Sequence, residues 1–252
     1  MELHYPIYIP SKGRADKCLT ARALDDEGTP FRIVVEPQER KSYADAYGEA
    51  RVLVLPFSDR GLVPVRNWIK DHATEEGYLR HWQLDDDLTS LKQCAKGGRV
   101  KREFRPLLAS SEAFVDRYEN VAIAGLKSAA YGHQTKVPFK TNQQVYGCVL
   151  VLNDLPYRWR GLRGEDTDFS LQVLSGGWCT ILFEAFQFDT VSSGTMSGGN
   201  TDGYEGDGRL ERARELQRRW PKLIKIRRTH GRPGFDCGHI WRKFDTPLKR
   251  AK

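Results

Sequence analysis

The first ninety residues alternate between short apolar stretches and longer amphipathic stretches, which is the pattern of a strand–helix repeat. Parallel strands need a crossover connection, usually a helix, so this alternation produces a largely parallel sheet with helices packed against it. The sequence therefore predicts an α/β fold with a doubly wound sheet. Helices are expected over 15–27 and 61–73, and strands over 5–10, 31–35, 51–55 and 79–84.

Three adjacent acids, Asp85, Asp86 and Asp87, follow the fourth predicted strand directly. Neighbouring carboxylates repel one another, and a hard divalent cation such as Mg²⁺ or Mn²⁺ removes that cost while sharing oxygen ligands with a phosphate. Alternate residues of an extended segment point the same way, so Asp85 and Asp87 could face one site. A solvated acidic turn is the alternative, but the apolar strand that precedes the acids favours a metal–phosphate site.

Two more segments fall at the same edge of the predicted sheet. Ser11-Lys12-Gly13-Arg14 follows the first strand, and Glu36 ends the second. A small-residue loop with a cation before a helix is how α/β folds present phosphate sites, and a carboxylate after the second strand often contacts a base or ribose. Either segment could also be an ordinary turn. Ligands of doubly wound sheets bind beyond the carboxyl ends of the strands, where all these segments lie.

Beyond the acids the repeat gives way to a mixed pattern. A polar hairpin over 91–104, a polar loop over 127–144 that covers the site and a glycine-rich lid over 190–208 are expected. The further predicted elements are helices over 110–118 and 209–220, and strands over 121–124, 147–152, 179–188 and 223–228.

A second acidic motif, Gly164-Glu165-Asp166-Thr167-Asp168, opens another predicted helix. Capping and the helix dipole favour acids in a first turn, and this explains one or two of the three. The functional interpretation makes Asp166 a general base that takes a proton from an acceptor hydroxyl.

The charge of the chain is unevenly distributed. Residues 209–252 hold fifteen Lys or Arg against four Asp or Glu, whereas the remainder holds 25 against 29. A basic block on a slightly acidic protein suggests a polyanionic partner such as nucleic acid, although a solubilising face would give the same charge. The candidate DNA-binding side chains of the predicted helix are Arg209, Arg212, Arg214, Arg218 and Arg219.

The cysteines and the hydropathy of the chain indicate which cellular compartment to expect. The five cysteines include no Cys-x-x-Cys pair, which favours a reducing compartment over a disulfide framework. Cys237-Gly238-His239 could be half of a zinc site, but the sequence has no matching half; a single histidine that completes an aspartate-bound metal is preferred. No long apolar run or signal peptide is present, so we expect a cytoplasmic protein that does not enter a membrane.

A family resemblance rests on five segments in this order and spacing. They are Ile9-Pro10-Ser11-Lys12-Gly13-Arg14, Trp82-Gln83-Leu84-Asp85-Asp86-Asp87, Gly164-Glu165-Asp166, Ser197-Gly198-Gly199-Asn200, and Gly231-Arg232 with His239 and Phe244. The chain thereby resembles, from about Tyr5 to about Phe244, the TET/JBP-associated glycosyltransferases of phages, which are nucleotide-sugar enzymes with a GT-A fold. The resemblance implies one GT-A-like domain with a nucleotide-sugar half (1–90), an acceptor half (91–208) and a basic end (209–252).

The resemblance also implies a role for each matching position. Asp85 and Asp87 resemble the metal-binding DxD pair, and Glu165 and Asp166 resemble the acceptor-side acidic motif. His239 resembles the C-terminal metal ligand of the family. His230 is a rival for that role because the C-terminal motif is longer here than in the family pattern. The donor-binding positions are Pro10, Ser11, Gly13, Arg14, Glu36, Arg66, Asp85 and Asp86.

The implied reaction uses Mn²⁺ or Mg²⁺ and a UDP-sugar, such as UDP-glucose or UDP-GlcNAc. The implied acceptor is 5-hydroxymethylcytosine, or another hydroxymethylpyrimidine, in phage DNA, acted on by a monomer or weak oligomer in the infected host cytoplasm. A hydroxymethyl group in a duplex is exposed in the major groove, so the base need not be flipped. The alternatives are transfer to a surface glycan or small molecule, a binding module without catalysis, and a metal-dependent nuclease, which explains neither the strand order nor the glycines.

Overall fold

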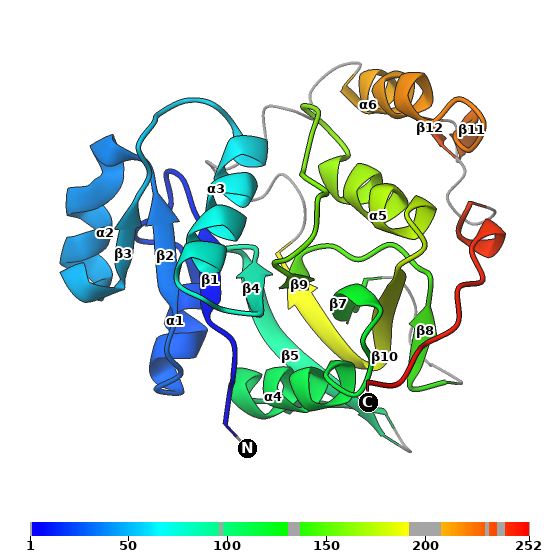
Figure 1. Cartoon of the computed structure of the whole chain (residues 1–252). Helices are drawn as coiled ribbons and strands as arrows, with labels where there is room; N and C mark the ends of the chain where they lie inside the picture. The colour runs from blue at the N-terminus through cyan, green and yellow to red at the C-terminus, as the bar shows by residue number, and fades with distance from the viewer. Residues whose placement is uncertain are drawn as a thin grey trace.

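A single mixed sheet runs through most of the molecule in the computed structural model (Figure 1). The model describes residues 2–95, 98–130, 137–191, 208–229, 232–235 and 240–251. The strand order is β3-β2-β1-β4-β9-β7-β10-β5-β6, with β8 paired to β10. The predicted α/β fold with a doubly wound mixed sheet is therefore confirmed.

The N-terminal half is the parallel part of the sheet. Its strands are β1 (Ile7–Pro10), β2 (Arg32–Val35), β3 (Val52–Val54) and β4 (Arg80–Leu84), and their pairings with one another are parallel. Its helices are α1 (Leu19–Asp26), α2 (Arg40–Tyr47) and α3 (Leu62–Glu75), with 3₁₀ turns at Pro37–Glu39 and Glu49–Arg51.

Side chains of β1 alternate between two separate clusters of the core. Ile9 packs in the cluster that contains Leu24 of α1 and Tyr43 of α2, whereas Tyr8 packs with Ile69 of α3. Because successive side chains of a strand point to opposite faces, α1 and α2 cover one face and α3 covers the other. The carboxyl ends of these strands therefore lie between helices from both layers.

The second half is built around an antiparallel strand inserted between parallel ones. Strand β9 pairs antiparallel with both β4 and β7, and β10 pairs parallel with β7 but antiparallel with β5. The strands are β5 (Leu88–Ala95), β6 (Gly98–Arg102), β7 (Val121–Ser128), β8 (Phe139–Thr141), β9 (Cys148–Leu152) and β10 (Cys179–Thr190). Helices α4 (Phe104–Val115) and α5 (Glu165–Ser175) extend the two layers.

The C-terminal region adds an amphipathic helix and a small hairpin. Helix α6 (Gly208–Arg219) buries Ala213 and Leu216, and Leu216 joins the cluster that contains α5. Strands β11 (Ile226–Thr229) and β12 (Arg232–Phe235) pair antiparallel, and a 3₁₀ turn follows at Trp241–Lys243. No helix among the described residues is long and apolar enough to cross a membrane.

Three local expectations differ from the structure. Helix α2 was not predicted, α4 begins at Phe104 rather than at residue 110, and the expected loop over 127–144 contains the end of β7 and all of β8. Pro106 lies in the first turn of α4, where a proline is tolerated because the first amides of a helix have no partner within the helix. The glycine-rich segment lies outside the described residues, except at its two ends.

Candidate active site

The acidic turn lies at the carboxyl end of β4 and is held by its backbone. The amide of Asp85 donates to the carbonyl of Gly147, which precedes β9, at 2.8 Å. Thr20, which is buried in α1, donates its hydroxyl to the carbonyl of Asp85 and accepts from the amide of Leu88 at 2.9 Å. The turn is thus fixed from both sides before any ligand binds.

The three acids of this turn have different environments. Asp86 is buried and accepts from the Arg14 guanidinium and the Ser11 hydroxyl, both at 2.5 Å. Asp85 points the other way, and its side chain is 38% exposed. Asp87 is half-buried. Asp86 therefore supports loop 11–14, whereas the side chains of Asp85 and Asp87 are less buried than that of Asp86.

Arg66 of α3 joins the acids that follow β4 to the acids in the first turn of α5. Its guanidinium lies 2.9 Å from a carboxylate oxygen of Asp85 and 3.9 Å from one of Asp166, and its side chain is only 2% exposed. Burial alone would lower the pKa of Arg66, but Asp166, Asp85 and Glu165 outweigh it and raise that pKa. The two predicted acidic motifs, 80 residues apart in the sequence, thus meet at one buried cation.

A buried polar chain that was not predicted orients Arg66. Gln83 accepts from the Arg66 guanidinium at 3.2 Å and donates to the Arg66 carbonyl at 3.1 Å. The Gln83 amide nitrogen also lies 2.9 Å from Nε2 of His81, and the other ring nitrogen of His81 contacts the Asn153 side-chain oxygen. Since the Gln83 amide must donate, His81 Nε2 accepts and its Nδ1 carries the proton. Burial lowers the pKa of His81 to about 4, so its ring is neutral.

The sequence carries a signal for this chain. His81, Gln83 and Asp85 alternate along β4, and alternate side chains of a strand share a face. Three polar side chains in a row on one face of a buried segment need polar partners from the helix that covers that face. Arg66 of that helix is such a partner.

The carboxylates around Arg66 repel one another. Loss of surrounding water, together with the charges of Asp166 and Asp87, raises the pKa of Asp85 to about 7, and Arg66 acts in the opposite direction. Burial and Asp86 raise the pKa of Asp87. Burial and Asp166 likewise raise the pKa of Glu165. These are acids that a bound cation would stabilise in their charged form.

The oxygen donors fit a hard divalent cation held by Asp85 and Asp87. Among the described residues, no group of three His, Cys, Asp or Glu side chains is assembled for a metal. Such a cation would therefore take further ligands from a diphosphate and water, which is usual for Mg²⁺. His230 and His239, predicted as further ligands, lie outside the described residues.

Loop 11–14 is organised by charged groups from β2 and α2. Gly13 adopts φ +68° and donates its amide to Glu39 at 2.5 Å, and the amide of Arg14 donates to the hydroxyl of Tyr43 at 3.0 Å. The buried carboxylate of Glu36 pairs with Lys12 at 2.8 Å. Pro10 ends β1 and is buried. Tyr43 and Glu39 were missed because α2 was not predicted.

The third acid of the second motif is structural. Asp168 is fully buried and accepts from Gln172 at 2.8 Å, from Arg160 at 2.8 Å and from the indole of Trp220 at 2.7 Å. Trp220 directly follows α6, so Asp168 fixes the basic helix beside α5. Glu165 and Asp166 precede it in the first turn of α5, and the Asp166 side chain is 17% exposed at the Arg66 site.

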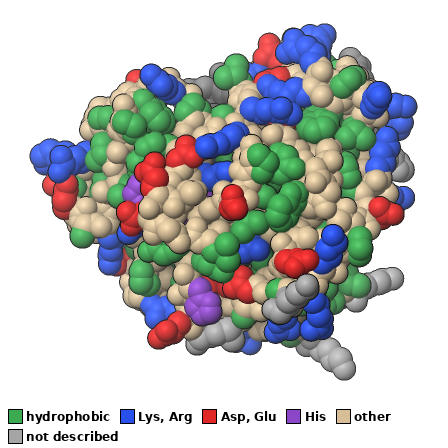
Figure 2. Space-filling model, viewed as in Figure 1, with side chains coloured by type: hydrophobic (Ala, Val, Ile, Leu, Met, Phe, Trp, Pro, Cys, Tyr) green, Lys and Arg blue, Asp and Glu red, His purple; other side chains and the backbone are tan. Residues whose placement is uncertain are grey.

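The arginines of α6 divide into two sets. Arg212 and Arg219 face inwards: a methyl group on Gly164 would lie 3.0 Å from Arg212, and one on Gly161 would lie 2.4 Å from Arg219. Arg214 and Arg218 are exposed. The side chain of Arg209 is outside the described residues. Figure 2 shows Lys and Arg gathered at the upper right, where α6 lies in Figure 1.

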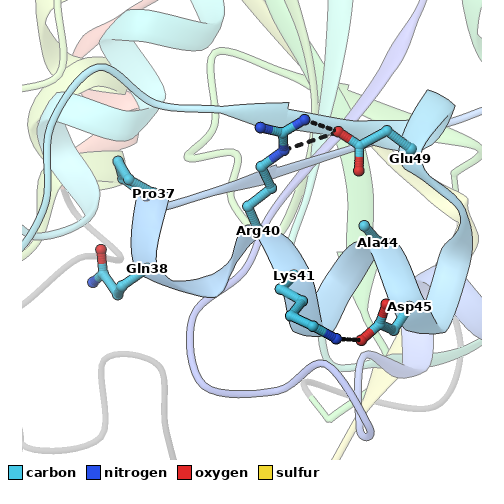
Figure 3. A pocket seen from close by; sticks show the side chains of 7 residues that line it. All are labelled: Pro37, Gln38, Arg40, Lys41, Ala44, Asp45 and Glu49. Atoms are coloured by element: carbon cyan, nitrogen blue, oxygen red, sulfur yellow. Dashed lines mark hydrogen bonds and ion pairs between the residues drawn. The ribbon is translucent and has the colours of Figure 1, made fainter.

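A separate surface hollow lies on α2, at the far edge of the sheet from α5 (Figures 1 and 3). It has a volume of about 410 Å³, and its charged groups pair with one another: Arg40 with Glu49 at 2.9 Å, and Lys41 with Asp45 at 2.6 Å. None of the predicted site residues lines it, so we assign no function to it.

Comparison with known proteins identifies the family. The family model of the TET-associated glycosyltransferases matches residues 5–199 of the chain. No curated protein matches. A solved structure from Desulfovibrio desulfuricans G20, described as a candidate nucleotide-diphospho-sugar transferase, is 10% identical and covers 87% of this chain and 99% of its own, with a TM-score of 0.44. The family match spans both acidic motifs and the arginine between them, and the chain therefore belongs to the TET-associated glycosyltransferases.

Proposed function

We propose that this glycosyltransferase moves a sugar from a UDP-sugar to 5-hydroxymethylcytosine in DNA, with the help of a divalent cation. One observation carries the proposal: Arg66 contacts Asp85 at 2.9 Å and lies 3.9 Å from Asp166, so the donor-side and acceptor-side acids share one site. A transferase needs this arrangement because the leaving diphosphate and the attacking hydroxyl must both be held at one sugar carbon.

The donor would lie at the carboxyl ends of β1, β2 and β4. Loop 11–14 and Glu36 would face the uridine, and Asp85 and Asp87 would hold Mn²⁺ or Mg²⁺ against the diphosphate. When bound, the cation neutralises charge on the leaving diphosphate. Arg66 would place a second positive charge at the same point, at a site that is already ordered.

The acceptor hydroxyl would lie at the first turn of α5. As its oxygen bonds to the sugar C1, the bond from C1 to the diphosphate breaks and the hydroxyl proton moves to Asp166. The Arg66 guanidinium lies 3.9 Å from a carboxylate oxygen of Asp166 and 2.9 Å from one of Asp85. Because this contact brings Asp166 to the arginine that also binds Asp85, we assign the base to Asp166 rather than to Glu165.

The DNA would lie against α6, whose fixed position beside α5 places its cations next to the acceptor acids. The exposed Arg214 and Arg218 are the phosphate contacts that the structure favours, whereas Arg212 and Arg219 are occupied within the protein. Replacing Arg214 and Arg218 together by Gln should weaken DNA binding. It should also reduce the slope of log K against log salt concentration by roughly the contribution of two phosphate contacts.

The test is sugar transfer measured by mass. The protein is incubated with Mn²⁺, a panel of UDP-sugars and DNA with or without 5-hydroxymethylcytosine, and the nucleosides are weighed after digestion. A hexose-sized gain on the modified base alone, lost with Asp85→Asn or a chelator, is the expected result. UDP release without any gain on DNA would refute the DNA acceptor and favour a glycan or a small molecule. No turnover with any donor would refute the proposed reaction and favour a binding module.

A further inference from the structure

Leu162 has an unusual position for an apolar side chain. It is 83% exposed, the highest value among the large apolar side chains that the structure describes, and the next is Leu79 at 57%. A single exposed leucine is ordinary. Leu162 differs because the loop that presents it is tightly fixed, so that its exposure is imposed by the fold rather than tolerated at a loose end.

Loop 159–164 is held from three sides. Trp159 stacks on Phe169 of α5 with ring centroids 4.0 Å apart, and Asn67 of α3 bonds to both its amide and its carbonyl, at 3.0 and 2.8 Å. The amide of Leu162 itself donates to Glu215 of α6 at 3.1 Å. The backbone is therefore anchored at the tip, and the side chain is directed away from the protein.

Cations surround this apolar tip. Arg160 and Arg163 flank Leu162, and each is paired on the protein side, Arg160 with Asp168 and Arg163 with Glu211. Segment 208–229, which contains α6, holds nine Lys or Arg against two Glu. One apolar side chain inside a basic surface matches duplex DNA, in which phosphates lie outside and stacked bases lie inside. A lone leucine buries too little area to hold a membrane, but it fills one base step.

The tip lies close to the acceptor acids. Leu162 and Asp166 are four positions apart in the chain, so their Cα atoms are at most about 14 Å apart. Asp166 is 17% exposed and Arg66 2%, so the reacting groups are recessed. A base inside an intact stack presents its hydroxymethyl group at the groove surface, whereas a base that has left the stack can enter such a recess.

We propose that Leu162 is a wedge that enters the base stack beside the target nucleotide and holds open the gap when that base moves into the site. The inference rests on the proposed DNA acceptor and proposes the alternative to a target base that stays in the stack. Unstacking a base is unfavourable, and an apolar side chain in the gap offsets part of that cost. Leu162 is accordingly a positioning residue for the acceptor.

The test compares paired and unpaired acceptors. Transfer to 5-hydroxymethylcytosine is measured in a perfect duplex and in a single strand, for the wild type, Leu162→Ala and Leu162→Met. We expect the ratio of duplex to single-strand rate to fall at least tenfold in Leu162→Ala and to be largely restored in Leu162→Met. Leu79→Ala, which removes the other highly exposed leucine from the amino end of β4, is the matched control and should leave the ratio unchanged.

A second readout needs no sugar donor. A duplex with 2-aminopurine next to the modified base should brighten when the wild type binds, and Leu162→Ala should lose most of that gain. If the wild type modifies the duplex and Leu162→Ala does so with an unchanged ratio, the wedge is refuted and the DNA acceptor stands. If the wild type neither binds nor modifies any DNA, both proposals fail; retention of the wild type on anionic vesicles, lost in Leu162→Ala, would then assign the tip to a lipid surface.

Discussion

Asp166 and Asp168 belong to one acidic motif, yet replacing them with asparagine should have opposite effects. In Asp168→Asn, one oxygen remains for Trp220, but an amide NH₂ replaces the oxygen that accepts from Gln172 and Arg160 at 2.8 Å. A hydrogen bond to a buried charged group contributes about 1.5–3 kcal/mol, and the Arg160 pair adds less because that side chain is half exposed. We expect the free energy of unfolding to fall by about 3 kcal/mol.

Thermal and urea unfolding measure this difference. A loss of about 3 kcal/mol in a chain of this size lowers Tm by roughly 6–12 °C. Asp166→Asn removes one of several repelling carboxylates, so it should unfold at the wild-type temperature or above while losing at least about a hundredfold in transfer rate. A normal Tm for Asp168→Asn with lost activity, or a lowered Tm for Asp166→Asn, would show that the two roles are wrongly assigned.

Three further predictions concern the floor of the site. Gln83→Leu removes one hydrogen-bond partner from Arg66 and one from His81, and it should cost about 1–3 kcal/mol in urea unfolding and lower kcat, whereas Gln93→Leu on the half-exposed β5 should do neither. In metal-free protein, the pKa of Asp85 is about 7 in the folded state, whereas an Asp in the unfolded chain has a pKa of about 4. The folded state therefore binds the Asp85 proton more tightly than the unfolded state does. Stability should therefore fall as pH rises from about 4 to about 7, and urea titrations of Asp85→Asn should lose that slope; an unchanged slope would show that Asp85 is not its source. Gly147→Ala puts a methyl group 2.8 Å from Phe188 at φ +73°, and it should lower the free energy of unfolding more than Gly28→Ala, which has φ +62° and open space around it. Equal losses of stability in the two variants would show that backbone strain alone, and not the contact with Phe188, causes the effect.

The parallel half of the fold was predictable because its strands are short, apolar and separated by amphipathic helices. The acids of the site were predictable because strands that end in carboxylates place them at one edge of the sheet. Helix α2 was missed because it is short and polar, with only Tyr43 and Tyr47 buried, and follows a proline that reads as a turn.

The partners of the acids could not be predicted from local patterns. Asp168 looked like another first-turn acid, but its role is set by Trp220, which lies 52 residues further along the chain. Asp86 was predicted as a donor-binding position, but a turn of the backbone directs its side chain to Arg14, 72 residues away. Such assignments depend on which elements become neighbours, and sequence periodicity carries no information about that.

The junction of Trp220 with Asp168 has a consequence for biosynthesis. The N-terminal half can fold early, because chains fold from the N-terminus while they are made. The wall behind Glu165 and Asp166 is supplied by α6, which begins only at Gly208. Until that helix is synthesised, Asp168 is a carboxylate without the indole that later holds it, so a nascent or truncated chain has the parallel half of its sheet before α5 is fixed against α6. The order of translation would thus delay the assembly of this wall until α6 has been made.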